Sequence, residues 1–419
     1  MDQKIVLIAE DSPLLGSKLK NILDQEISQQ VIWVQSHADA MDVLQKSGQK
    51  IIAAVVNYSL PGADSGKTIS NILSHGVPTI AFTGTVDNQV RERIWALQAV
   101  DYVPKDSPAS LDYVVGMVKR IIKNRAIKAL VVDDSGVIRE TISHLLKIHC
   151  YQVLGAGNGV EAMQLLEQNP DIRLVITDYQ MPEMDGIQLI RKIRQRYSRN
   201  ELGIIGISAA GNSLMAAKFI KNGANDYIIK QNFLTEEFYC RISQCMDQIE
   251  HVASIREAAI KDPLTHLYNR RYFFDIGNKI LASARRKKEP VVAAMIDVDH
   301  FKKINDRFGH DVGDVVLQQM AALLQKRCRK SDIFARFGGE EFCFLANNMD
   351  PAHAQMFFDM FCNLVEAHPI EVSTGEVVPV TISIGVCREQ LDRVEDMISK
   401  ADANLYKAKK AGRNQVVCQ

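Results

Sequence analysis

The sequence predicts three domains: two copies of a doubly wound α/β unit, followed by one domain of α+β type. A length of 419 residues suits about three domains. The first part of the chain repeats itself, and each copy alternates short apolar strands with helical stretches. After about residue 258 the repeat stops, and longer helices separate strand candidates at 291–296, 332–337, 341–346 and 378–386. We therefore predict domains at residues 1–124, 125–247 and 262–419, with a helical linker at 248–261.

The composition is that of an ordinary globular protein, with 47% hydrophobic residues and 50 basic against 50 acidic side chains. A net charge of zero leaves no electrostatic footprint for nucleic acid, so none is expected as a partner. The longest apolar runs, such as residues 51–56, are far below the roughly 20 residues that cross a bilayer, and no membrane insertion is expected. The amino terminus lacks the features of a secretory signal, and the 8 cysteines lack metal-ligand spacing. We expect a cytoplasmic protein with reduced thiols.

Three short segments carry the repeat. KIVLIAEDS at 4–12 returns as KALVVDDSG at 128–136, VVNYSLPGADSG at 55–66 as VITDYQMPEMDG at 175–186, and AVDYVPKD at 99–106 as ANDYIIKQ at 224–231. In a parallel sheet with helices on both faces, ligands bind beyond the carboxyl ends of the strands. The polar residues expected there are Glu10, Asp11, Asn57, Thr83 and Lys105 in the first copy and Asp133, Asp134, Asp178, Ser208 and Lys230 in the second.

The second copy has the residues for phosphoryl chemistry. Asp133, Asp134 and Asp178 would gather three carboxylates around one point, and hard oxygen ligands of this kind suit Mg²⁺. A carboxylate beside a metal can attack phosphorus, because the cation neutralises the incoming phosphoryl oxygens. Lys230 would add a fixed positive charge, and Ser208 would add a hydroxyl donor.

This constellation resembles the receiver domain of two-component response regulators, which has a flavodoxin-like (βα)5 fold, and the match runs from residue 128 to about 247. The resemblance implies that a sensor histidine kinase or phosphotransfer protein phosphorylates Asp178. It also implies that Asp133 and Asp134 bind one Mg²⁺ together with Asp178, and that Ser208 and Lys230 contact the phosphoryl group.

Two further positions bear on this resemblance. Tyr227 matches the aromatic switch position of the family, whereas Gln231 stands where the family usually has proline after the lysine. The alternative is that strand-end carboxylates merely solvate a loop. Five matching positions in order favour the receiver interpretation.

The first copy resembles the same family with one decisive change, because Asn57 stands where the phosphoacceptor aspartate belongs. An amide is not an anionic oxygen nucleophile. We interpret this copy as a pseudo-receiver that serves as an adaptor or dimerisation surface. A rival interpretation is a pocket that senses some other anion.

Three segments of the third domain carry chemistry: MIDVDHFKKINDRFGHDVGD at 295–314, RKSDIFARFGGEEF at 329–342 and LYKAKKAGRN at 405–414. Asp297 ends an apolar strand, so its carboxylate would emerge at the sheet edge. Gly338 and Gly339 lie between two strand candidates, and a Gly-Gly turn closes a tight hairpin because both residues tolerate positive φ. Glu340 and Glu341 would project from the hairpin toward Asp297. Acidic side chains so placed can hold one or two divalent ions about a nucleotide's phosphates.

These segments resemble the GGDEF domain of diguanylate cyclases, in its GGEEF variant, and DPLTHLYNRR at 262–271 resembles the family's opening motif. The resemblance implies an α+β palm-like fold and one or two Mg²⁺ per GTP. It implies that Asp297 and Glu340 coordinate the metal with the backbone carbonyl of Val298, and that Glu341 supports the metal or the attacking hydroxyl. The other substrate-binding residues that it implies are Lys302, Lys409 and Arg413 for the phosphates, Gly338 and Gly339 for close approach, and Asn305 and Asp314 for guanine.

Asp314 also has a physical reason to select GTP over ATP. Guanine offers N–H donors at N1 and N2 that a carboxylate can accept, while adenine presents an acceptor at N1. The alternative for Asp314 alone is a helix-start charge that the helix dipole favours.

Arg329 and Asp332 form an RxxD pair five residues before the glycines, which resembles the family's inhibitory product site. Arginine can clamp a phosphate or a guanine edge, and aspartate can accept from guanine. The alternative is a surface ion pair of little energetic value. The fixed distance from the hairpin favours the regulatory site.

The combined resemblance implies a response regulator that condenses two GTP into cyclic di-GMP and two pyrophosphates. Phosphorylation of Asp178 would promote a homodimer in which two GTP-loaded domains face each other. The alternative from another class is a non-catalytic receptor or scaffold that binds cyclic di-GMP at Arg329 and Asp332. Before the third domain, apolar residues from Ile242 to Ala259 at three-four spacing resemble a short coiled coil, or equally a lone amphipathic helix covering its own domain.

Overall fold

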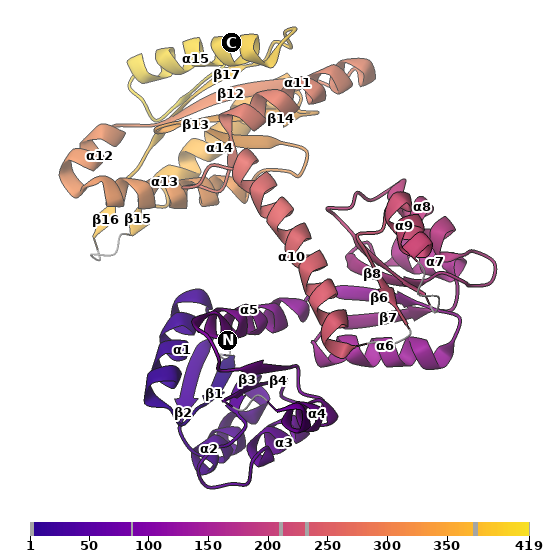
Figure 1. Ribbon diagram of the computed structural model, residues 1–419. Coiled ribbons are helices and arrows are strands. Elements are labelled where there is room, and N and C mark those ends of the chain that lie inside the picture. Colours follow the sequence, from indigo (N-terminus) through magenta and orange to yellow (C-terminus); the bar gives the residue numbers. More distant parts are fainter. Residues whose placement is uncertain (1–3, 85–86, 209–212, 231–233, 372–375, 419) are drawn as a thin grey trace. The chain divides into compact units, whose positions relative to one another are not determined.

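The computed structural model describes residues 4–84, 87–208, 213–230, 234–371 and 376–418 (Figure 1). The chain divides into two compact units, Met1–Ala253 and Ser254–Gln419. In the described part of the chain, the first unit contains two five-stranded sheets and the second contains a six-stranded sheet with a separate two-stranded one. No helix in these ranges combines the length and apolar character needed to cross a membrane.

The first sheet has the order β2-β1-β3-β4-β5, and every pairing in it is parallel. This is the strand order of flavodoxin-like folds. Helices α1 and α5 bury their apolar side chains on one face, and α2, α3 and α4 cover the other. The elements are β1 (Ile5–Ala9), α1 (Pro13–Glu26), β2 (Gln30–Val34), α2 (His37–Ser47), η1 (Gly48–Lys50), β3 (Ile51–Asn57), α3 (Lys67–Ser74), β4 (Thr79–Thr83), α4 (Asn88–Ala96), β5 (Asp101–Pro104) and α5 (Pro108–Asn124).

The second sheet repeats this topology as β10-β9-β8-β6-β7, again with parallel pairings only. Helices α6 and α10 cover one face, and α7, α8 and α9 cover the other. The prediction of two flavodoxin-like domains is confirmed. The elements are β6 (Lys128–Val132), α6 (Gly136–Ile148), β7 (Gln152–Ala156), α7 (Gly159–Gln168), β8 (Ile172–Asp178), α8 (Gly186–Arg194), β9 (Gly203–Ser208), α9 (Ser213–Asn222), β10 (Asp226–Ile229) and α10 (Thr235–Ile260).

Ion pairs and hydrogen bonds join the two sheets within the first unit. The indole of Trp95 on α4 donates to the Glu236 carboxylate on α10 at 2.8 Å, and the Arg91 guanidinium lies 2.6 Å from the same carboxylate. On α5, the buried guanidinium of Arg120 contacts both Asp247 and Glu250 of α10. The first copy therefore holds α10 near its start and again about three turns later.

Helix α10 has two halves with different environments. Its first half buries Ile242, Cys245 and Ile249 in the core of the second copy. This part of the apolar three-four pattern therefore covers its own domain. Its last turns are exposed, and Ile255 has 69% of its surface accessible.

The six-stranded sheet of the second unit has the order β11-β13-β14-β12-β17-β18. Helices α11 and α15 pack on one face, and α12, α13 and α14 pack on the other (Figure 1). The predicted α+β domain is confirmed. The elements are β11 (Tyr268–Asn269), α11 (Arg270–Lys287), β12 (Val291–Val298), α12 (Phe301–Phe308), α13 (His310–Gln325), β13 (Ile333–Gly338), β14 (Glu341–Asn347), η2 (Pro351–His353), α14 (Ala354–Glu366), β15 (Ile370–Glu371), β16 (Val377–Val378), β17 (Ile382–Cys387), α15 (Val394–Lys410) and β18 (Val416–Cys418).

Two details of this unit differ from the expected pattern. The apolar run at 378–386 reads as one strand, but the chain leaves β16 after Val378 and enters β17 only at Ile382. Pro379 lies in the gap, and proline has no N–H to donate to a strand ladder. The short edge strands β11 and β18 have too few residues to show a period in the sequence.

Candidate functional site

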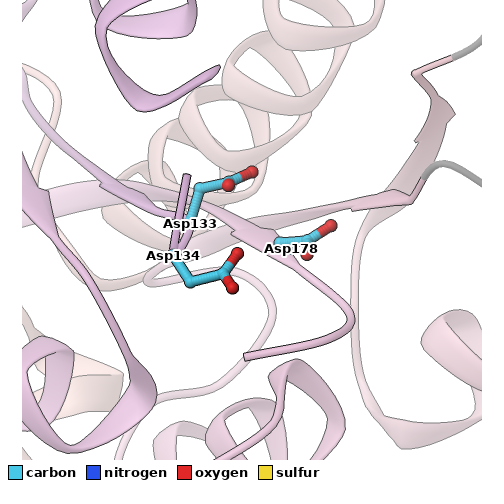
Figure 2. A group of neighbouring side chains, drawn as sticks. All are labelled: Asp133, Asp134 and Asp178. Atoms are coloured by element: carbon cyan, nitrogen blue, oxygen red, sulfur yellow. The ribbon is translucent and has the colours of Figure 1, made fainter. Parts of the chain in front are cut away.

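The pocket of the second copy is built at the carboxyl ends of β6 and β8. Asp133 and Asp134 follow β6 directly, and Asp178 is the last residue of β8. One oxygen from each carboxylate lies within 4.8 Å of the others, and Figure 2 shows the three side chains around one space. Among the residues that the structure describes, this is the one group of three or more such side chains that could hold a metal ion.

Lys230 follows β10 and bridges two of these carboxylates. Its Nζ lies 2.8 Å from Asp178 Oδ1 and 2.7 Å from Asp133 Oδ2. Burial raises the pKa of the Asp178 carboxyl, while Lys230 acts in the opposite direction. Ser208 at the end of β9 is buried, and its carbonyl accepts from the Lys230 backbone N–H. The structure thus brings together the predicted pocket residues of the second copy.

Tyr227 lies in β10 beside this pocket and is buried in the present conformation. Its ring centroid lies 5.3 Å from that of Phe219 on α9. Phe219 in turn packs against Gly206 of β9, where a Cβ would overlap the ring. Gln231, the position that departs from the receiver pattern, lies outside the described residues.

The pocket of the first copy lies at the same place in an equivalent sheet, but its side chains are paired differently. The Asn57 amide donates to Asp11 Oδ1 at 2.7 Å, so the residue at the acceptor position binds its acidic neighbour directly. Lys105 lies 2.6 Å from Glu10 Oε2, and Thr83 is buried at the end of β4. Burial raises the pKa of Glu10. Within this pocket, Asn57 is therefore paired with Asp11, and Lys105 with Glu10.

The acidic residues of the second unit lie where β12 and β14 run side by side, although Asp297, Glu340 and Glu341 do not bring one oxygen each within 4.8 Å of one another. Asp297 near the end of β12 pairs in register with Glu341 at the start of β14, which places both side chains on the same face of the sheet. Glu340 precedes Glu341 in the turn, and its backbone carbonyl accepts from Val298 N–H at 3.3 Å. Lys409 from α15 reaches the same point, with Nζ 2.7 Å from Asp297 Oδ2.

Asp297 is 95% buried, and this burial raises the pKa of its carboxyl to about 6. The hydrogen bond from Lys409 acts to lower that pKa, whereas the carboxylates of Glu340 and Glu341 raise it further. The local electrostatics at Asp297 therefore combine burial, two further carboxylates and the Lys409 ammonium.

The hairpin that carries Glu340 differs from the expected Gly-Gly turn. Gly338 still belongs to β13 and pairs with Glu341, so the two turn residues are Gly339 and Glu340. Only Gly339 has positive φ, at 56°. The turn is held by Arg336, whose Nε and Nη2 donate to the Gly339 carbonyl at 3.0 and 2.8 Å. Arg336 is itself paired with Asp262, at 3.2 Å.

The candidate guanine residues lie where α12 meets α13. Asn305 Oδ1 is buried and accepts no hydrogen bond from the described part of the chain. Gly313 on α13 makes room for it, because a Cβ at that position would overlap Asn305 Oδ1. Asp314 is the next residue and is exposed, as is Lys302 on α12.

The RxxD pair lies immediately before β13. The Arg329 backbone N–H donates to Asp332 Oδ2 at 3.0 Å, so the motif closes on itself through the main chain. The Arg329 side chain is exposed, and burial raises the pKa of the Asp332 carboxyl. The half-buried Asp332 carboxylate is thus fixed beside the backbone of Arg329, whose side chain is exposed.

Sequence reasoning missed residues that act through other residues. Arg336, Asp262 and Gly313 shape the site. Asp299 does so as well, because it accepts a hydrogen bond from the backbone of a distant turn. The glycine in GHDVGD and the second aspartate of MIDVD were visible signals. Their partners lie far away in the chain, so neither spacing nor periodicity pointed to a role.

Comparison with known proteins agrees with the fold of both units. The family of response regulator receiver domains matches residues 6–114 and 129–238, and the family "Diguanylate cyclase, GGDEF domain" matches residues 259–415. The response regulator PleD of Caulobacter vibrioides is 31% identical over 285 residues, which is 64% of this chain and 63% of PleD. Diguanylate cyclase A of Treponema denticola is 37% identical over 183 residues, 40% of this chain and 49% of that protein.

A crystal structure described as a two-component system response regulator/GGDEF domain protein superimposes with a TM-score of 0.55 at 37% identity, covering 59% of this chain and all of that one. The chain spans less than two thirds of the length of the curated relatives above. The chain belongs to the response regulators, with two receiver domains followed by a GGDEF domain, as predicted.

Proposed function

We propose that this response regulator is a diguanylate cyclase that condenses two GTP into cyclic di-GMP with release of two pyrophosphates. The observation that carries the proposal is the meeting of Asp297, Glu341 and Lys409 beside the GGEEF hairpin. The 3′-hydroxyl oxygen of one GTP would attack the α-phosphorus of the other, and the bond to pyrophosphate would break. Such a reaction needs positioning and charge stabilisation rather than a covalent nucleophile.

The residues present fit a magnesium site. Asp297 and Glu340 offer carboxylate oxygens, the Val298 carbonyl is adjacent, and the pKa of Asp297 is raised by burial among acidic neighbours. When bound, Mg²⁺ would neutralise charge on the phosphates of GTP, with one or two ions per nucleotide. One further Mg²⁺ would be held by Asp133, Asp134 and Asp178 in the second receiver domain.

The basic residues would then bind the β- and γ-phosphates. Lys409 is bonded to Asp297 and would exchange that partner for a phosphate oxygen. Lys302 and Arg413 are exposed and available for the same purpose. Gly338 and Gly339 are exposed, and their lack of side chains would allow the nucleotide to approach the hairpin backbone closely.

Guanine recognition is supported by the unpaired oxygen of Asn305. A buried acceptor with no partner in the described structure is costly, unless a ligand supplies a donor. Guanine has such donors at N1 and N2, and Asp314 on the next helix would accept from the same edge. Adenine lacks this pattern, so GTP is the proposed substrate.

Two regulatory properties complete the proposal. Each cyclase domain would hold one GTP, so two chains must meet as a homodimer, and a phosphoryl donor such as a sensor histidine kinase would promote this by phosphorylating Asp178. The adjacent side chains of Arg329 and Asp332 would bind cyclic di-GMP as an inhibitor.

The pseudo-receiver would serve as an adaptor, since Arg91 and Arg120 attach it to α10.

The test is to incubate the purified protein with GTP and Mg²⁺ and to quantify cyclic di-GMP by chromatography. Product should form in the wild type and should be lost in Glu340→Gln, which keeps the size of the side chain and removes its charge. The competing function, a scaffold that binds cyclic di-GMP without making it, would show product binding in both proteins and product formation in neither.

Product inhibition has its own test. Arg329→Ala should raise the plateau of product formed, because the cation that would clamp the phosphate or guanine edge is gone. Product affinity measured by calorimetry should fall about tenfold or more, since a charge-assisted bidentate contact is lost. An unchanged affinity would remove this part of the proposal.

A further inference from the structure

Asp299 is a buried carboxylate two residues beyond Asp297, and only 4% of its surface is accessible. It accepts hydrogen bonds from three groups on two other segments. Ser383 Oγ on β17 donates to Oδ1 at 2.7 Å, and Thr381 Oγ1, just before β17, donates to Oδ2 at 2.9 Å. The third donor is the backbone N–H of Asn414, at 3.0 Å from Oδ2.

The Asn414 contact falls on an unusual piece of backbone. Arg413 and Asn414 are consecutive non-glycine residues with positive φ, at 66° and 45°, directly after Gly412 at 119°. Left-handed conformations are unfavourable for residues with a Cβ, and they persist only where the surroundings over-determine them. Two backbone hydrogen bonds and the Asp299 carboxylate provide this restraint.

Hydrogen bonds restrain the backbone at Arg413 and at the residue that follows it. The Arg413 N–H donates to the Ala408 carbonyl at 3.1 Å, and the next N–H along the chain donates to Asp299. Beyond the turn, the Gln415 carbonyl accepts from Ile384 N–H at 3.0 Å, which ties the chain to β17. Asp299 is the one side chain in the described structure that accepts a hydrogen bond from this turn's backbone and also bonds the strand beside it.

We propose that Asp299 is a positioning residue for nucleotide binding. It holds the left-handed turn at 413–414, so that the Arg413 guanidinium is presented to the β- and γ-phosphates of a nucleoside triphosphate. This inference rests on the proposed function, because it assigns Arg413 to those phosphates. It assigns Asp299 no contact with the metal or the substrate.

The test compares a triphosphate with a monophosphate. Binding of α,β-methylene GTP, which resists attack at the α-phosphorus, and of GMP is measured by calorimetry with Mg²⁺. Asp299→Ala should weaken binding of the triphosphate analogue about tenfold or more and change GMP binding less than twofold, because GMP lacks the β- and γ-phosphates. A purely structural role for Asp299 would weaken both ligands equally.

The conservative variant Asp299→Asn should rescue most of the affinity. Its amide can turn its oxygen to the Asn414 and Thr381 donors and give its NH₂ to Ser383, whose hydroxyl can accept as well as donate. Adding Asp299→Ala to an Arg413→Ala variant should cause no further loss of the triphosphate analogue, because the two residues act in series. Additive losses would overturn the inference.

Two controls keep the outcomes separate. Val365→Ala shortens a buried core side chain on α14 that is not among the hydrogen-bonding partners of Asp299 or of the turn, and it should lower thermal stability while leaving the ratio of the two affinities unchanged. If Asp299→Ala does not fold, Thr381→Val removes one donor that orients Oδ2 and should give a two- to threefold loss confined to the triphosphate. If the wild type fails to bind the triphosphate analogue, the proposed function itself is wrong, whereas binding with equal losses for both ligands defeats only the role of Asp299.

Discussion

The two receiver pockets have the same strand topology but differ in how their polar side chains pair with one another. In the first, the Asn57 amide donates to Asp11, and Lys105 neutralises Glu10. In the second, Lys230 bridges Asp133 and Asp178, which leaves Asp134 and a net negative charge around the same space. A single amide thus gives the first pocket an internal hydrogen bond at the position where the second pocket has a third carboxylate.

This comparison explains how degeneration can leave a domain intact. A carboxylate at position 57 would oppose Asp11 unless a cation lay between them, whereas the amide supplies a donor in the same volume. The α4 and α5 side chains of the first domain form ion pairs with α10. An asparagine at position 57 is therefore compatible with the surface that contacts α10.

The largest expected effect comes from Asp178→Asn. The variant should lose all response of cyclase activity and of assembly to beryllofluoride with Mg²⁺, because the amide cannot act as the acceptor. Activity assays and light scattering before and after beryllofluoride would measure this. Asn57→Ala is the matched variant in the other pocket and should keep its response. If Asp178→Asn still responds, the assignment of the two pockets is wrong.

An intermediate effect is expected for Asn57→Asp, which would make the first pocket resemble the second. Without metal, the new carboxylate faces Asp11 and loses the amide hydrogen bond, so the free energy of unfolding should fall by about 1–3 kcal/mol. Millimolar Mg²⁺ should restore about 1.4 kcal/mol or more when it is present at ten times its dissociation constant.

Thermal unfolding with and without Mg²⁺ would test this, and the fluorescence of Trp33 offers a local probe because its indole N–H donates to the Glu10 carbonyl at 2.8 Å. Asn57→Ala should lose the same hydrogen bond but should show no response of this pocket to Mg²⁺. Equal Mg²⁺ responses in the two variants would contradict the idea that the amide alone excludes the cation.

The smallest expected effect concerns equivalent aspartates that begin the last strand of each receiver domain. Asp226 on β10 is paired with Arg241 at 3.0 Å, whereas among the described residues Asp101 on β5 has the Tyr113 hydroxyl as its one side-chain donor, at 2.6 Å. Burial raises the pKa of Asp101 from 3.8 to about 6, and the nearby Glu236 carboxylate adds to this. The folded state therefore favours the protonated form of Asp101 more than the unfolded state does.

The sign of the pH dependence follows from that preference. The stabilising contribution of Asp101 is complete below about pH 4 and is lost as the pH rises through 6. The stability of the wild type relative to Asp101→Asn should fall between pH 4 and pH 7 by at most about 3 kcal/mol. Urea unfolding at several pH values would measure this difference. Tyr113→Phe, which removes the donor to the carboxylate, should steepen the loss, and a flat difference would contradict it.

Much of the architecture could be predicted because local signals agree with the fold. Fully apolar runs such as residues 51–56 can only be buried strands, and the repeat fixes two domains of one size. The GGEEF segment and the acidic pairs place the candidate chemistry at strand ends. Pro379 and Gly338 were misjudged, because a strand end depends on the hydrogen bonds of its neighbour rather than on its own composition.

Residue types and their order in the sequence alone determined the three-domain organisation, the difference between Asn57 and Asp178 at equivalent positions, and the acidic character of the candidate site in the third domain. Only the tertiary structure decided which side chains meet. Arg336 reaches Asp262 across 74 positions, and Asp299 reaches Asn414 across 115. Such contacts depend on how strands and turns from distant segments pack together, and a hydrogen bond over that separation leaves no periodic trace in the chain.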